Sequence, residues 1–145
     1  MPRQTHLTPE FVELVPRELE DGVLYVSMTY GSVIHKCCCG CGEHVVTPLA
    51  PTDWKLTYDG DVVSLYPSIG NWSFHCQSHY WIQDNQVRWA GRMSAPEIEA
   101  LRARERMTRQ CFYGSEQPVE TAPPPPETAR RGSFWTGVRR WFRLN

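Results

Sequence analysis

HKCCCGCGEH, residues 35–44, places four cysteines within five positions and a histidine at each end. A second group, Cys76 and His79, follows in the stretch FHCQSH. Thiolates and imidazoles from two separated segments are the usual ligands of structural zinc. Disulfides are disfavoured, because cysteines this close in sequence rarely all reach the Cα spacing that a disulfide requires. The two groups therefore predict a zinc ion that staples a small domain.

The residues alone leave the choice of ligands open, because the chain offers more candidates than a tetrahedral ion uses. Alternate cysteines would project to the same side of an extended segment, whereas a Cys-x-x-Cys-Gly pair would form a knuckle. The alternate set is Cys37, Cys39 and Cys41, and the knuckle pair is Cys38 and Cys41. Cys76 is the ligand expected from the second group, and His79 or His35 is able to replace a cysteine. The remaining candidates are interpreted as surface histidines, His44 and His75, and as a small packing residue in a helix, Cys111.

The cysteine cluster is expected at the tip of a β-hairpin. Residues 22–36 are rich in β-branched and aromatic residues and are interpreted as one strand with a bend at Gly31. Residues 44–49 are its partner strand. The lead-in, residues 5–21, shows a weak helical pattern instead.

Two further hairpins follow the cluster. Residues 54–58 and 61–67 alternate in hydrophobicity on either side of an Asp-Gly turn, which is a strong hairpin signal. Residues 80–90 are interpreted as two short strands around the turn QDNQ. The expected fold is mainly β, with about six strands in short antiparallel hairpins held by zinc.

The sequence changes character after this β domain, which is expected to span residues 1–92. Residues 93–112 hold a helix from about 95 to 111, because Ser94 and Glu97 form a capping box before a run of good helix formers. Residues 113–132 are Pro-rich and predict an extended linker. Residues 133–145 form a basic, aromatic terminal segment, which is expected either to dock on a partner or a membrane surface or to pack back on its own acidic domain.

Charge argues against nucleic acid as a partner. Residues 1–92 carry six Lys and Arg against ten Asp and Glu, a net charge of −4, whereas residues 93–145 carry nine against six, a net charge of +3. Phosphate binding requires clustered Lys and Arg, which the acidic β domain lacks. The sequence shows no signal peptide and no long apolar span, so a cytoplasmic location, where thiols stay reduced, is expected.

Potential catalytic groups are dense between the second and third hairpins, in YPSIGNWSFHCQSHYWI. A serine becomes a nucleophile when a base lies within hydrogen-bond reach, and His79 is the nearest candidate base for Ser68. The residues alone favour a plainer interpretation, in which Ser68 caps a turn and His79 binds zinc or packs.

The stretches HKCCCGCG, LYPSI, CQSHYWI and VRW, together with the tryptophan-containing hairpin between the first two, resemble a bacterial family named BubE. The resemblance covers roughly residues 20–92. It implies a zinc-containing serine peptidase of the deubiquitinase type, encoded in operons for ubiquitination-like conjugation. The implied partners are a ubiquitin-like protein and the enzymes that activate and conjugate it.

The resemblance also implies roles for single residues. The family knuckle reads Cys-Pro-Cys-Gly-Cys-Gly, and Cys38 stands in the position of the proline, which implies the ligands Cys37, Cys39, Cys41 and Cys76. A closed site of four cysteines makes the zinc structural. Ser68 is then the nucleophile and His79 the base, with Ser78 as the alternative nucleophile.

Two features of such a peptidase remain to be assigned. Backbone amides of the segment IGNW are expected to form an oxyanion hole, because Gly70 permits unusual dihedral angles. The side chain that orients His79 is sought among Asp53, Asp61 and His35. Two other functions remain open: a non-catalytic zinc module that binds a protein partner, and a hydrolase that uses zinc and a bound water.

Overall fold

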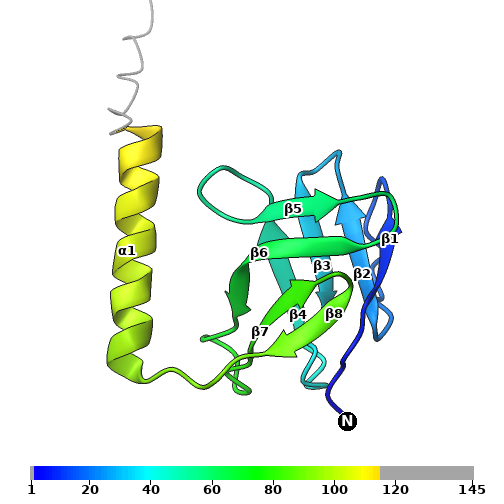
Figure 1. The fold of residues 1–145 in the computed structure, drawn as a ribbon, viewed down its shortest axis with the longest axis horizontal. Coiled ribbons are helices and arrows are strands. Elements are labelled where there is room, and N and C mark those ends of the chain that lie inside the picture. Colours follow the sequence, from blue (N-terminus) through cyan, green and yellow to red (C-terminus); the bar gives the residue numbers. More distant parts are fainter. Residues whose placement is uncertain (1, 115–145) are drawn as a thin grey trace, which may run out of the picture. The chain divides into compact units, whose positions relative to one another are not determined.

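A computed structural model of the chain describes residues 2–114. It is mainly β, as predicted, with eight strands in two sheets and one helix in this part of the chain (Figure 1). The predicted linker, apart from its first two residues, and the predicted terminal segment lie outside the described residues. No helix in the described part is long and apolar enough to cross a membrane.

The first sheet has the strand order β1-β2-β3-β4. Its strands are β1 (Thr8–Phe11), β2 (Val23–Ser27), β3 (Ser32–Lys36) and β4 (His44–Pro48). The second sheet has the order β5-β6-β7-β8. Its strands are β5 (Lys55–Tyr58), β6 (Val63–Gly70), β7 (His79–Gln83) and β8 (Gln86–Trp89). All pairs are antiparallel except β1 with β2.

The three predicted hairpins are confirmed: β3 pairs with β4, β5 with β6, and β7 with β8. Two strands were not predicted. Residues 22–36 are two strands, because the chain reverses at a turn before Gly31, whose φ of 55° suits glycine. The helical prediction for residues 5–21 is wrong over Thr8–Phe11, which forms β1 and pairs in parallel with β2.

The lead-in is extended because both of its sides find backbone partners. The amide of Thr8 donates to the carbonyl of Gly22 in front of β2, and the amide of Leu7 donates to the carbonyl of Asn85 before β8. Buried backbone groups need such partners. A helix here would leave the backbone groups along the edges of both sheets without hydrogen-bond partners. Isolated bridges join His6 to Gln86 and Leu49 to Trp54, so the edges of the two sheets meet on both sides.

The two sheets enclose one core. Its members are mostly β-branched, leucine or aromatic residues, and in β3, β4 and β7 they alternate with more exposed residues, as period-2 strands require. Fully or almost fully buried are Leu7, Leu24, Val26, Val33, Val63, Leu65, Ile69, Tyr80 and Ile82. Three cysteines of the two predicted groups border this core, because Cys37 belongs to it and Cys39 and Cys76 pack against it.

Helix α1 (Ala95–Tyr113) confirms the predicted helix. Both halves of the capping box form, and the carboxylate of Glu97 accepts from the backbone amide of Ser94 at 2.7 Å. The helix buries none of its residues, so the prediction that Cys111 packs against the domain is wrong. Arg109 donates to the carboxylate of Asp53, which ties the helix to the loop before β5.

Candidate active site and metal centre

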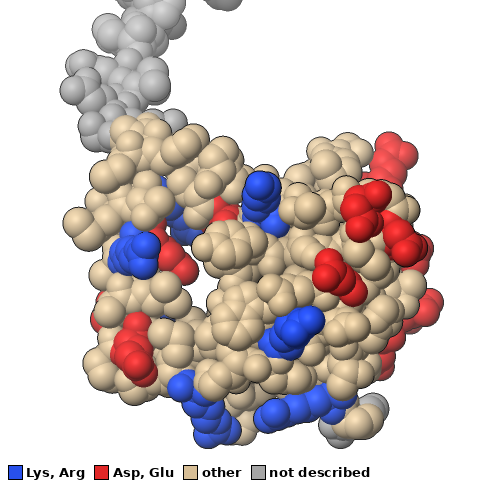
Figure 2. Space-filling model, viewed as in Figure 1, with Lys and Arg blue, Asp and Glu red and all other residues tan. Residues whose placement is uncertain are grey.

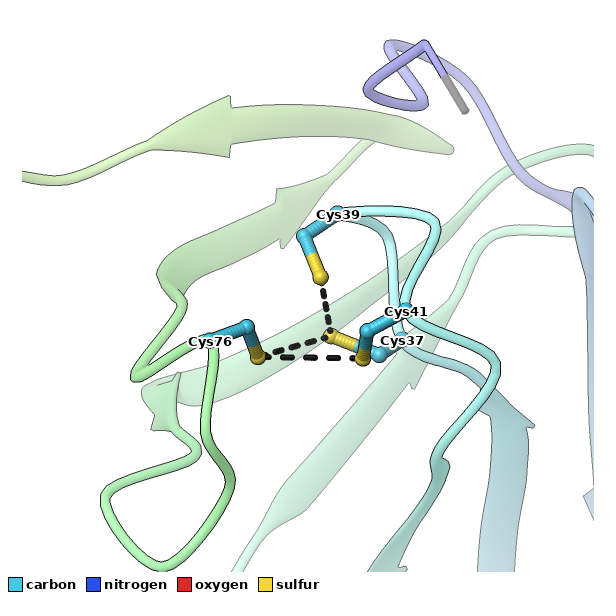
Figure 3. A group of neighbouring side chains, drawn as sticks. All are labelled: Cys37, Cys39, Cys41 and Cys76. Atoms are coloured by element: carbon cyan, nitrogen blue, oxygen red, sulfur yellow. Dashed lines mark hydrogen bonds between the residues drawn. The ribbon is translucent and has the colours of Figure 1, made fainter.

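Four cysteine sulfurs gather where the β3–β4 hairpin tip meets the loop between β6 and β7 (Figure 3). The sulfurs of Cys37, Cys39, Cys41 and Cys76 all lie within 4.8 Å of one another. Gly40 and Gly42 have φ of 86° and 85°, a region that L side chains avoid, and these two residues curl the tip so that its three cysteines face Cys76. The two separated segments therefore come together, and all six cysteines are free.

The spacing of the sulfurs fits a tetrahedral ion. Cys37 Sγ lies 3.4 Å from Cys39 Sγ and 3.8 Å from Cys76 Sγ, and Cys41 Sγ lies 3.8 Å from Cys76 Sγ. Metal–sulfur bonds of about 2.3 Å at tetrahedral angles place the sulfurs about 3.8 Å apart. The four thiols can therefore hold a metal ion without rearrangement of the backbone.

Two polar side chains support the cluster from within the domain. Ser78 is buried, and its Oγ lies 3.1 Å from Cys37 Sγ and 3.5 Å from Cys76 Sγ. Asn71 Nδ2 donates to Ser78 Oγ at 2.9 Å. Because the amide nitrogen can only donate, the hydroxyl hydrogen of Ser78 is free to point at a cysteine sulfur.

The thiols differ in how readily they ionise. Burial raises the pKa of Cys37 and of Cys39. Burial acts in the same direction on Cys76, but hydrogen bonds from the side chain and backbone of Ser78, and from two other cysteines, outweigh it and lower the pKa of Cys76 to about 7. A bound cation would deprotonate all four, because metal ligation requires the thiolate.

Cys38 and His35, which the residues alone left open as ligands, lie outside the cluster. Cys38 is fully buried beside the Tyr80 hydroxyl, and burial raises the pKa of its thiol to about 12. His35 Nε2 forms a 2.9 Å hydrogen bond with Tyr80 Oη, and burial lowers the pKa of its ring to about 3. Both are core groups. His44 and His75 are exposed, as predicted.

A serine and a histidine meet on the outer face of the second sheet. Ser68 Oγ on β6 lies 3.0 Å from His79 Nε2 at the start of β7. The register between these strands shifts between Leu65 and Ile69, so Ser68 sits in a β-bulge. Bulges commonly re-aim a side chain next to a functional site, and this one brings the hydroxyl to the imidazole.

The second ring nitrogen of His79 contacts the backbone. His79 Nδ1 lies 3.1 Å from the carbonyl oxygen of Gly91, just after β8. A carbonyl only accepts, so Nδ1 carries the hydrogen and Nε2 of the neutral ring is left as an acceptor for the Ser68 hydroxyl. The contact therefore fixes the tautomer that a general base needs.

Two tryptophans contact the imidazole. The ring of His79 lies 5.0 Å from that of Trp72 and 5.5 Å from that of Trp81, centroid to centroid. Trp72 in turn lies over Gly70, where an added Cβ would come within 2.4 Å of the indole. Gly70 is needed because a side chain there would displace the ring that supports His79.

The sequence predicts an oxyanion hole in the segment IGNW because of the conformational freedom of Gly70, and this reason is wrong. Gly70 has no left-handed φ, since it lies in β6 opposite His79. The amide of Asn71 already donates to the carbonyl of Ser78 at 2.9 Å, so it does not face a substrate.

None of the three predicted orienting residues contacts His79 in the described part of the chain. Asp53 pairs with Arg109, Asp61 lies exposed in the β5–β6 turn, and His35 is in the core. The orienting group is the Gly91 carbonyl, which sequence reasoning missed. Every residue has a carbonyl, so no sequence signal could have identified this one.

Comparison with known proteins identifies a family. The model of the family described as "bacterial ubiquitination-like system serine protease (BubE)" matches residues 11–90, more than half of the chain. No curated protein and no solved structure gives a match. On its sequence, the chain belongs to the BubE family of serine proteases from bacterial ubiquitination-like systems.

Proposed function

We propose that this protein is a serine peptidase of the deubiquitinase type, with Ser68 as nucleophile and His79 as general base. The observation that carries the proposal is the 3.0 Å contact between Ser68 Oγ and a His79 Nε2 whose tautomer is fixed from the other side of the ring. Ser78, the alternative nucleophile, is buried against the cysteine sulfurs, which favours Ser68.

The chemistry follows from this arrangement. The Ser68 hydroxyl gives its proton to His79 Nε2 while Oγ attacks the carbonyl carbon of the substrate. The imidazolium then protonates the leaving amine, and the bond to that amine breaks. Water, deprotonated by the same nitrogen, attacks the acyl carbon, and the imidazolium returns the proton to Ser68 Oγ as the ester bond breaks. The Gly91 carbonyl keeps Nδ1–H in place and stabilises the imidazolium in the role that a carboxylate fills in many triads.

The proposed substrate is a ubiquitin-like protein, cleaved at its C-terminal end from a precursor extension or from a conjugate. The family belongs to a ubiquitination-like system, which supports a ubiquitin-like partner and contact with its activating and conjugating enzymes.

The proposed metal is zinc in a structural role. Four thiolates fill a tetrahedral zinc ion and leave no position for a reactive water. Cys37, Cys39, Cys41 and Cys76 would hold it and would staple the hairpin tip to the loop that carries Ser78 into β7. This arrangement counts against a zinc hydrolase. Ligands that work as thiolates also suit the proposed cytoplasmic location.

A non-catalytic binding module is the second candidate, because the cysteine cluster alone would serve it equally well. The serine–histidine pair separates the two, since a module that only binds has no use for a hydroxyl aimed at a fixed histidine tautomer.

The test uses the Ser68→Ala variant with a ubiquitin-like protein, from a ubiquitination-like system, that carries a C-terminal extension. Cleavage should fall at least about 10³-fold, while metal content and circular dichroism stay unchanged. A fluorophosphonate probe should label the wild type at Ser68. Ser73→Ala is the matched control, because Ser73 is an exposed serine of the same loop region. Full cleavage by Ser68→Ala, or an inert wild type that still binds the protein, would refute the proposal.

A further inference from the structure

The outer face of the second sheet carries side chains in rows that lead away from the serine–histidine pair. Beside the pair, Tyr66 on β6 and Trp81 on β7 line the same groove, and their register partners on the neighbouring strands β5 and β8 are Lys55 and Arg88. The next row is uncharged and polar: Thr57, Ser64, Gln83 and Gln86. Rows on one face of a sheet are two residues, or about 6.7 Å, apart.

A groove of about 350 Å³ lies over these rows. It is lined by Thr57, Ser64, Leu65, Tyr66, Trp81, Gln83 and Asp84. Trp81 packs on the ring of His79 at 5.5 Å, and Tyr66 precedes Ser68 by two residues in the same bulged strand. The groove therefore adjoins the proposed catalytic pair through Trp81 and extends to Asp84 in the β7–β8 turn.

The near part of the groove is apolar, and its aromatic side chains are solvent-exposed. Tyr66 is 72% exposed and Trp81 is 36% exposed. Two neighbouring aromatic residues offer a surface that an aliphatic side chain can cover, which removes apolar area from water on both partners. Lys55 and Arg88 stand on either side, so a basic side chain would be repelled at this position.

The far end of the groove is acidic. Asp84 lines this end. In the described residues, the one side-chain hydrogen bond of Asp84 is accepted by its Oδ1 from the neutral Ser64 hydroxyl, at 3.2 Å. Asp59 and Asp61 lie in the neighbouring β5–β6 turn. Figure 2 shows acidic side chains gathered toward the end of the sheet where the two turns lie. A cationic side chain is favoured here.

We infer that this groove binds the extended segment on the acyl side of the scissile bond, with an aliphatic residue over Tyr66 and Trp81 and a basic residue two positions earlier, at Asp84. The inference rests on the proposed function, and it names the feature of the substrate that the peptidase reads. The acyl side is the part that precursors and conjugates share, so a preformed groove serves recognition best there. Alternate residues of an extended chain face the same side, which matches one row spacing of the sheet.

The experiment compares three coumarin amides: acetyl-Arg-Gly-Leu-Gly, acetyl-Arg-Gly-Ser-Gly and acetyl-Glu-Gly-Leu-Gly. Wild type should cleave the first with kcat/KM about tenfold above the second. The Arg-to-Glu change should cost about fivefold, and Asp84→Lys should reverse that preference while leaving the preference for Leu over Ser intact. Tyr66→Ala should remove the preference for Leu. The matched control is Glu20→Lys, because Glu20 is an exposed carboxylate that lies just before β2 and does not line the groove.

Binding of the same peptides, as free acids, to the Ser68→Ala variant separates the two proposals. Tryptophan fluorescence measures this binding. If the peptides bind with the expected order but wild type neither cleaves nor accepts the fluorophosphonate probe, the groove stands and the peptidase proposal fails. If Ser68 is labelled but neither cleavage nor binding changes in Tyr66→Ala and Asp84→Lys, the groove inference is wrong. A loss of chain self-association in these variants, with peptide preference unchanged, would assign the face to a second copy instead.

Discussion

The cysteine cluster and the serine–histidine pair are built in different ways. The cluster joins a hairpin tip of the first sheet to the β6–β7 loop through four side chains of one rare type. The pair joins β6 to β7 within one sheet through two common side chains, a bulge and a backbone carbonyl. The first centre is specified by residue type and the second by backbone geometry.

The two centres are nevertheless adjacent along the chain. Ser78 supports the cysteines, and His79, the next residue, faces outward to Ser68. Successive residues at the start of a strand point to opposite faces, so one peptide unit serves both centres. We therefore expect the metal to fix the position of His79 without taking part in its chemistry. Disturbing each centre alone tests this division.

The largest effect is expected from the cysteines. Cys76→Ser should abolish metal binding and leave the domain unfolded, because apparent zinc-binding energies of about 10–16 kcal/mol equal or exceed the stability of a small domain. Metal analysis and circular dichroism measure this directly. Cys111→Ser, at an exposed position of α1, should match wild type.

Cys38→Ser extends that test to the ligand set. Cys38 lies in the core beside Tyr80 and outside the cluster, so this variant should keep its metal. If Cys38→Ser loses the ion and Cys37→Ser retains it, the proposed ligand set is wrong.

The same contrast explains which features of the fold and of the candidate site could be predicted from the sequence. Clustered cysteines and the Ser94–Glu97 capping box are local patterns with few alternative meanings, so they located the candidate metal centre and α1. Asp-Gly before β6 and Asp-Asn between β7 and β8 located two hairpins, and Asp84 and Asn85 adopt the positive φ such turns require.

Features that depend on backbone groups distant in the sequence could not be predicted from it. Strand β1 is extended because Gly22 and Asn85 supply carbonyls on its two sides, and no local pattern reveals those partners. The orienting group of His79 is the Gly91 carbonyl, which carries no residue signature. Gly70 was singled out for the wrong property, because its value lies in the space it leaves for Trp72.

An intermediate effect is expected from Gly70→Ala, which leaves every proposed catalytic and metal-binding group in place. The added Cβ would lie 2.4 Å from the Trp72 indole, so the ring must move and His79 loses one of its two supports. We expect a loss of about 1–3 kcal/mol in unfolding free energy, and a drop of about 10–100-fold in kcat, with metal content unchanged.

A double-mutant cycle checks the cause of that drop. Trp72→Leu removes the clashing ring, so Gly70→Ala should cost little further activity in that background. Additive losses in the double variant would mean that Gly70 acts on the site by another route.

The smallest effect on catalysis, and the sharpest test of the division, is expected from Ser78→Ala. This change removes the hydroxyl that lies 3.1 Å from Cys37 Sγ and leaves Asn71 Nδ2 without its 2.9 Å acceptor. Groups that support metal ligands typically contribute about 10–100-fold to affinity, so competition with a chelating dye should show a loss of that size. With zinc saturating, kcat should stay within about threefold of wild type, because Ser68 and His79 keep their contact on the other face of the strand. Ser73→Ala should change neither quantity. A loss of about 10³-fold in kcat with the metal retained would make Ser78 the nucleophile, and the two centres would then be one.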